Sequence, residues 1–180
     1  MDHPTSRLTG LPANRPPDRS LDQAAGRIPD RTADRRTAAD DRADIIDVLH
    51  TYAWAIDSRD FPLLATDVFA ERVIADYGLP EPLRSAAELV EYMTAAHRHL
   101  DATQHLIGNC SVRLAGDTAT SRCYAHASLV RRGTPGGERI VFGAHYSDEL
   151  VRGANGWRIH RRVARMFFRD GNLAVLRPPA

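Results

Sequence analysis

Two residues whose side chains suit proton transfer stand at the ends of expected structural elements. Asp57 closes a stretch of helical periodicity, and His105 lies near the start of a strand-like stretch. A carboxylate at a helix C-terminus faces the unfavourable end of the helix dipole and needs a hydrogen-bond donor, which His105 can supply. With one ring nitrogen bonded to a carboxylate, the other ring nitrogen is a stronger base. Such a pair can move protons in dehydration, isomerisation or aldol-type cyclisation, with no metal or organic cofactor.

Simpler interpretations of the same residues stay open at this stage. A histidine in a strand can be a packing residue, and the segment 57–60 (DSRD) can cap the helix that follows. His97 and His99 follow a helix and are expected to face water. The remaining histidines of the sheet have no tight ligand spacing, so no metal site is expected: His105, His126 and His145.

The elements that must position this pair fall into two halves of the chain. Ile45, Leu49, Tyr52 and Ile56 recur at helical spacing and predict a helix over about 41–57. A short helix over about 61–68 and a strand over 72–77 are expected next. A third helix should follow Ser85, as part of a capping box with Glu88.

The second half predicts four long strands separated by turn signals. They run over about 102–114, 118–131, 139–151 and 157–168, and form an antiparallel meander. Helices first and sheet second indicate an α+β fold, in which about three helices cover one face of a strongly curved, cone-shaped sheet. The space between helices and sheet is the expected pocket.

Composition excludes several classes of function. The 24 basic and 23 acidic residues nearly cancel, which argues against a nucleic-acid or anionic-membrane partner. The sequence contains no Lys, so a Schiff-base mechanism has no candidate residue. Cys110 and Cys123 form no metal motif and suit a reducing compartment. No stretch resembles a signal peptide or a transmembrane helix, so a cytoplasmic protein is expected.

Three regions are expected along the chain. Residues 1–40 are rich in Arg, Asp, Pro and Ala, contain no aromatic residue and are predicted to be a disordered tail, or to result from a start codon chosen too far upstream. Residues 41–172 form the domain. Residues 173–180 form a short tail that can cover the mouth of the pocket.

Three segments resemble the SnoaL-like and scytalone dehydratase family of the nuclear-transport-factor-2-like superfamily. They are 52–61 (YAWAIDSRDF), 103–109 (TQHLIGN) and 143–150 (GAHYSDEL), the last followed by Gly156 and Trp157. The resemblance covers about residues 41–170. It implies that Asp57 and His105 are the catalytic pair, which also serves as the proton-abstracting pair in hexachlorocyclohexane dehydrochlorinase.

The resemblance also implies a set of substrate-binding residues. Tyr77 matches a substrate-orienting tyrosine and Ser147 a pocket serine, while Arg152 falls at the essential arginine of the dehydrochlorinase. His145, Ser147 and Glu149 alternate on one face of their strand and are expected to face the pocket. Ile56 and Glu149 depart from the dehydratase pattern, and a second strand histidine has no counterpart, which argues against the melanin-pathway substrate.

The sequence therefore favours a lyase or isomerase, either a dehydratase or a polyketide-type cyclase, that acts on a small, mostly apolar molecule. The alternatives are a non-catalytic binding module and the small subunit of a ring-hydroxylating dioxygenase. In the last strand Arg158, His160 and Arg162 alternate with Ile159, Arg161 and Val163. An arginine-rich sheet face of this kind is compatible with a homodimer or homotrimer.

Overall fold

The computed structural model describes residues 37–177. The element order is α1 (Ala38–Asp57), the π-helical turn η2 (Leu64–Val68), β1 (Phe69–Asp76), β2 (Leu83–Ser85), α2 (Ala86–His97), β3 (Ala102–Ala115), β4 (Thr118–Val130), β5 (Arg139–Gly153), β6 (Gly156–Gly171) and the 3-10 turn η3 (Leu173–Leu176). The α+β architecture and the four-stranded meander predicted from the sequence are confirmed. None of the helices between residues 37 and 177 is long and apolar enough to span a membrane.

The first helix begins at Ala38, three residues earlier than predicted. Thr37 and Asp40 form a capping box, in which each side chain accepts a hydrogen bond from the other residue's backbone N–H. Residues 37–40 therefore belong to the folded domain and not to the tail, while residues 1–36 lie outside the described part. Before α2, Ser85 caps the helix as predicted, but the Glu88 carboxylate accepts from the N–H of Arg84.

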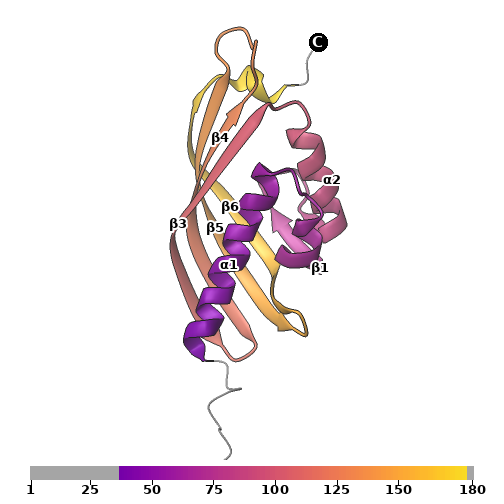
Figure 1. Ribbon diagram of the computed structural model, residues 1–180, viewed down its shortest axis with the longest axis vertical. Helices are drawn as coiled ribbons and strands as arrows, with labels where there is room; N and C mark the ends of the chain where they lie inside the picture. Colours follow the sequence, from indigo (N-terminus) through magenta and orange to yellow (C-terminus); the bar gives the residue numbers. More distant parts are fainter. Residues whose placement is uncertain (1–36, 178–180) are drawn as a thin grey trace, which may run out of the picture. The chain divides into compact units, whose positions relative to one another are not determined.

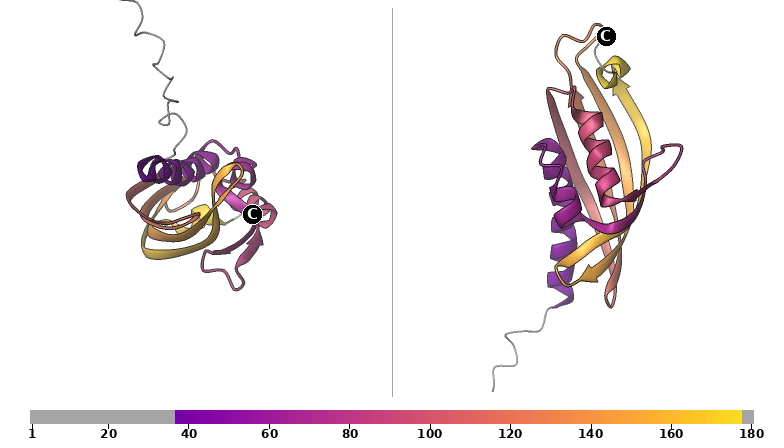
Figure 2. Two further views of the ribbon diagram at one scale, coloured as in Figure 1. Left: turned by 90° about the horizontal axis from the view of Figure 1, so that it is seen from below. Right: turned by 90° about the vertical axis from the view of Figure 1, so that its right-hand side faces the viewer.

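The sheet has six strands in the order β2-β1-β6-β5-β4-β3 and does not close into a barrel. Strands β3 to β6 pair antiparallel, whereas β1 lies parallel to β6. After β2, at one edge of the sheet, the chain passes through α2 to the opposite edge, where β3 starts the meander. Figures 1 and 2 show the meander curving around the helices, with α1 alongside β3 and α2 over the sheet next to β1.

Three β-bulges interrupt the meander and contribute to its curvature, because a bulge bends its strand and increases the local twist. Asn109 lies in the β3 bulge with a positive φ of 52°. In β6, His160 and Phe167 are the extra residues, since Ile159 and Arg161 pair with the adjacent Leu150 and Glu149, and Met166 and Phe168 pair with the adjacent Ala144 and Gly143. Each extra residue reverses the inside–outside alternation of the strand beyond it.

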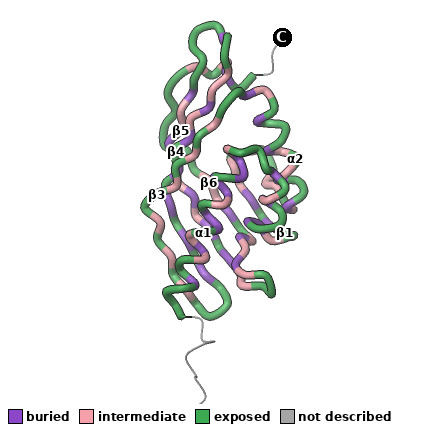
Figure 3. Tube along the Cα trace, viewed as in Figure 1, coloured by how far each residue is buried: buried purple, intermediate pink, exposed green. Residues whose placement is uncertain are grey.

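The apolar core lies between the helices and the concave face of the sheet. Fully buried residues from α1, η2, β1, β5 and β6 form it, including Ile45, Leu49, Leu64, Phe69, Leu150, Trp157 and Ile159. Figure 3 shows buried positions alternating with exposed ones along the strands. A second, smaller cluster of buried apolar residues lies apart from this core: Leu100, Ala127, Leu129, Ile140 and Val175.

One ion pair lies inside this core. Arg162 and Asp148 have no exposed side-chain surface, and Nε and Nη2 of Arg162 donate to the two carboxylate oxygens at 2.8 Å each. The guanidinium group also stacks on the rings of Tyr52 and Tyr146, at 4.3 and 4.4 Å from their centroids. Burial lowers the pKa of Arg162, but the Asp148 carboxylate outweighs this, so the net pKa is raised and the side chain stays charged.

The substitution Asp148→Asn should therefore be costly. It leaves the buried guanidinium group without a counter-charge, and we expect it to lower the free energy of unfolding by about 3–5 kcal/mol. Urea denaturation measures the change. The matched control is Glu149→Gln, because Glu149 is the next residue on the strand and its ion pairs, with His160 and Arg161, are exposed. The control should cost less than about 1 kcal/mol. Equal effects of the two substitutions would contradict this account of the core.

Candidate active site

Asp57 and His105 are in direct contact. The Nδ1 atom of His105 lies 2.7 Å from Oδ1 of Asp57, and the backbone N–H of His105 donates to Oδ2 at 2.6 Å. The Thr103 hydroxyl donates to Oδ1 at 2.9 Å. The carboxylate at the end of α1 is thus held by three hydrogen bonds, all from the first residues of β3.

The contact determines which tautomer the imidazole adopts. Partial burial raises the pKa of Asp57, but the hydrogen bonds from the side chain and backbone of His105 and from Thr103 outweigh it, so the net pKa lies below the ordinary value. An ionised carboxylate only accepts, so Nδ1 of His105 carries a proton and neutral His105 presents a lone pair at Nε2. The pair has the arrangement of a general base with its orienting carboxylate.

His105 lies in the wall of a cavity of about 400 Å³ on the concave face of the sheet. The cavity lies between α2 and strands β4 to β6, and its wall is mostly apolar. Its lining includes Met93, Ala127, Leu129, Phe142, Ala144 and Leu176. Leu176 belongs to η3, so the C-terminal segment contributes to this wall, as the sequence predicted for a tail that covers the pocket mouth.

Four tyrosines line the same cavity: Tyr52, Tyr77, Tyr92 and Tyr146. The hydroxyl of Tyr77 donates to that of Tyr52 at 3.3 Å. Burial raises the pKa of all four, so they remain protonated near neutral pH. The guanidinium group of Arg162 lies against Tyr52 and Tyr146, and its Nη1 atom has no hydrogen-bond partner among residues 37–177.

The remaining predicted substrate-binding residues are not in this cavity. Tyr146 and Ala144 line it, so the alternate residues His145, Ser147 and Glu149 lie on the outer face of β5, and the expectation that they face the pocket is wrong. The physical reason is the ion pair of Asp148. Its carboxylate is on the same side of β5 as Tyr146 and is neutralised by Arg162, so this side is buried and the other side faces outward.

Arg152 is likewise distant from the pair. Its guanidinium group donates to both carboxylate oxygens of Asp41, at 2.5 and 2.6 Å, and stacks on Trp157. Asp41 lies near the start of α1 and Asp57 at its end, sixteen residues or roughly 24 Å away at 1.5 Å per residue. Arg152 therefore ties the start of the helix to the sheet.

Sequence reasoning missed four residues of the cavity wall or its support. Tyr52 was assigned to the apolar side of its helix and Tyr146 was given no role. Arg162 was assigned to the arginine-rich sheet face and His97 to solvent, yet His97 lines the cavity and is 7% exposed. The signal for Tyr52 and Tyr146 was present, since buried tyrosine hydroxyls usually need partners. No local pattern identified Arg162 or His97.

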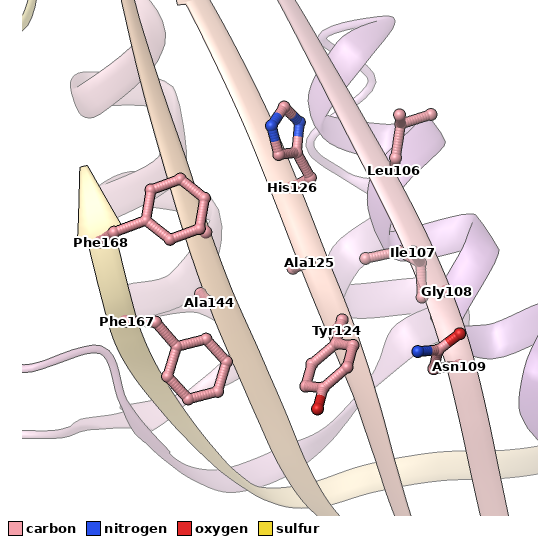
Figure 4. Close-up of a pocket in the computed structure, with 11 residues that line it drawn as sticks. Leu106, Ile107, Gly108, Asn109, Tyr124, Ala125, His126, Ala144, Phe167 and Phe168 are labelled. Carbon is pink, nitrogen blue, oxygen red and sulfur yellow. The ribbon is translucent and has the colours of Figure 1, made fainter. Parts of the chain in front are cut away.

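A second cavity, of about 520 Å³, lies on the opposite face of the sheet. Figure 4 shows the rings of Tyr124, Phe167 and Phe168 along this outer groove, with Leu106 and His126 farther along the strands. Tyr124, Phe167 and Phe168 are each more than half exposed. Both phenylalanines point outward because Phe167 is the extra residue of the second β6 bulge.

The chain matches known proteins over most of its described part. The model of the SnoaL-like domain family matches residues 37–163. An uncharacterised protein of Mycobacterium tuberculosis is 34% identical over 125 residues, which cover 68% of this chain and 83% of the relative.

Two solved structures show the same architecture. A protein of Novosphingobium aromaticivorans, described as a candidate aromatic ring hydroxylase, is 26% identical and superposes with a TM-score of 0.68, covering 79% of this chain and 100% of that one. A hexachlorocyclohexane dehydrochlorinase is 15% identical with a TM-score of 0.65, over 77% and 93% of the two chains, and shows the shared fold alone. From the match of the family model over most of its length, the chain belongs to the SnoaL-like domain family.

Proposed function

We propose that the protein is a lyase or isomerase, a dehydratase or polyketide-type cyclase, in which Asp57 and His105 are the general acid–base pair. The observation that supports this most directly is the 2.7 Å contact between the two side chains at the wall of a mostly apolar cavity. The proposed substrate is a small, mostly apolar hydroxy-ketone or polyketide-like ring.

The proposed reaction begins with proton abstraction from the carbon beside the substrate carbonyl. Nε2 of His105 takes this proton, and the Asp57 carboxylate stabilises the imidazolium that forms. In a dehydration the imidazolium then returns the proton to the departing hydroxyl group, so the enzyme is regenerated and water is released. In an isomerisation or cyclisation the proton returns to carbon or oxygen instead.

In this proposal the tyrosine hydroxyls bind the carbonyl oxygen as enolate charge develops. Tyr77 and Tyr52 remain protonated, and because Tyr77 donates its proton to the Tyr52 oxygen, the proton of Tyr52 is the one left for the carbonyl oxygen. The positive charge of Arg162 behind the rings favours a negative charge in front of them, and the two N–H groups of its Nη1 atom have no partner among the described residues. Fixed donors aimed at a developing oxyanion stabilise the transition state more than the ground state.

Hydrogen–deuterium exchange in D2O tests the proton-abstraction step without knowledge of the natural substrate. A panel of cyclic β-hydroxy ketones is incubated with the protein, and exchange beside the carbonyl is followed by NMR. We expect Asp57→Asn and His105→Ala to slow exchange by roughly 10²–10⁴-fold. Asp60→Asn, an exposed carboxylate three residues from Asp57, is the control. Binding of a panel member with exchange indifferent to both substitutions would indicate the alternative, a non-catalytic binding module.

The ionisation of Asp57 also predicts how stability depends on pH. The folded-state pKa of Asp57 is below the unfolded value of about 3.9, so its contribution is complete above pH 4 and is lost as the pH falls through the folded pKa. The destabilisation caused by Asp57→Asn should therefore shrink as the pH is lowered from 6 to 3. Urea titrations measure this difference, with Asp47→Asn, an exposed residue of the same helix, as control. A difference that stays constant over this range would be inconsistent with the assigned ionisation.

We further propose that the outer groove pairs with a second or third copy of the chain, as the sequence led us to expect. Contiguous exposed aromatic residues of this kind are typical of association surfaces. Light scattering after size exclusion should give a mass of two or three chains of 19.9 kDa for the wild type and of one chain for Phe167→Asp. Trp54→Asp, on α1 and 72% exposed, should leave the mass unchanged. A monomeric wild-type protein at micromolar concentration would rule the proposal out.

A further inference from the structure

His97 is a second histidine of the cavity and has no role in the proton transfers above. It is the last residue of α2 and lines the same cavity as His105, with the ring centroids 6.4 Å apart. The ring of Phe61 lies on it, at 5.9 Å between centroids. The sequence placed His97 in water, but the hydrogen bonds of Arg59 bring the end of α2 against the end of α1. Arg59 donates to the backbone carbonyls of His97 and Leu100.

The tautomer of His97 follows from its contact with its own helix. Nδ1 lies 2.8 Å from the carbonyl oxygen of Met93, and a carbonyl can only accept, so Nδ1 carries the proton. Burial lowers the pKa of His97, as do the nearby charges of His105 and Arg59, and together they outweigh the opposing effect of the Met93 carbonyl. The ring is therefore neutral near pH 7, and Nε2 has a free lone pair.

Nε2 lies on the ring edge opposite the helix contact and has no hydrogen-bond partner among the described residues. The ring neighbours of His97 are Phe61 and His105, and the cavity that it lines includes the apolar side chains of Met93, Leu129 and Phe142, which offer no side-chain donor. A ligand that covers this acceptor without donating a hydrogen bond to it binds less tightly, because the acceptor loses its contact with water. A ligand that donates a hydrogen bond to Nε2 avoids this cost. His105 also lies about equally far from the acceptor residue His97 and from the donor residue Tyr52, with ring centroids 6.4 and 6.5 Å away.

We propose that His97 is a specificity-determining residue, whose Nε2 accepts a hydrogen bond from a hydroxyl group that the substrate keeps through the reaction. The substrate class is then a ring compound with a phenolic or enolic hydroxyl at the His97 side and a carbonyl group at the tyrosine side. The carbonyl half of this statement rests on the proposed function. The hydroxyl half rests on the geometry of His97 alone and is tested by binding.

Two probes that differ only in the donor test the proposal. They are 2-naphthol and 2-methoxynaphthalene, which share the ring and the oxygen, and calorimetric titration gives the Kd of each. Wild-type protein should bind 2-naphthol roughly tenfold more tightly than the ether, the usual effect of one hydrogen bond to a buried group. His97→Leu should remove this preference without weakening the ether. His97→Gln, which keeps an acceptor, should retain part of it, and His99→Leu, outside the cavity wall, should retain all of it.

A thermal unfolding transition for each variant establishes that the variant is folded. If His97→Leu does not fold, His97→Gln provides the test. Equal affinity of the wild type for the two probes would overturn the proposal. So would a preference that persists in His97→Leu and disappears in His105→Ala, because the hydroxyl would then be bound by the catalytic pair. Deuterium exchange that survives Asp57→Asn would refute the proposed function, whereas the naphthol preference is measured without turnover and stands or falls separately.

Discussion

The site depends on one carboxylate that joins the end of a helix to the start of the meander. Asp57 closes α1, where the helix dipole opposes a negative charge, and three donors from Thr103 and His105 offset that cost. The same bonds orient the imidazole and leave Nε2 free. Because two of the donors are on His105 itself, the base cannot be reoriented without breaking the contact between α1 and β3.

The second constraint is the buried charge at the other side of the cavity. Asp148 and Arg162 would each be very costly to bury alone, so each residue needs the charge of the other in the folded protein. The pair places a cation behind Tyr52 and Tyr146 while keeping it out of water.

Much of this organisation could be read from local patterns. The spacing of Ile45, Leu49, Tyr52 and Ile56 requires an amphipathic helix, and the turn signals between the long strands delimit a meander, because these depend on residues close in the chain. The types and places of Asp57 and His105 suited a hydrogen-bonded pair, and the family resemblance indicated the same two residues. The observed start of the first helix differs from the predicted one because Thr37 and Asp40 form a capping box, which extends the helix toward the N-terminus.

The sequence by itself determined the elements and proposed the pair, whereas only the tertiary structure decided which side chains of the sheet face the cavity. Strict alternation put Arg162 outside, but the bulge at His160 adds one residue and turns Arg162 inward. The family resemblance put His145 inside, but burial of Asp148 beside Arg162 places Tyr146 there instead. Bulges and buried ion pairs depend on strands far apart in the chain, so no local period records them, and a shift of one residue exchanges the two faces.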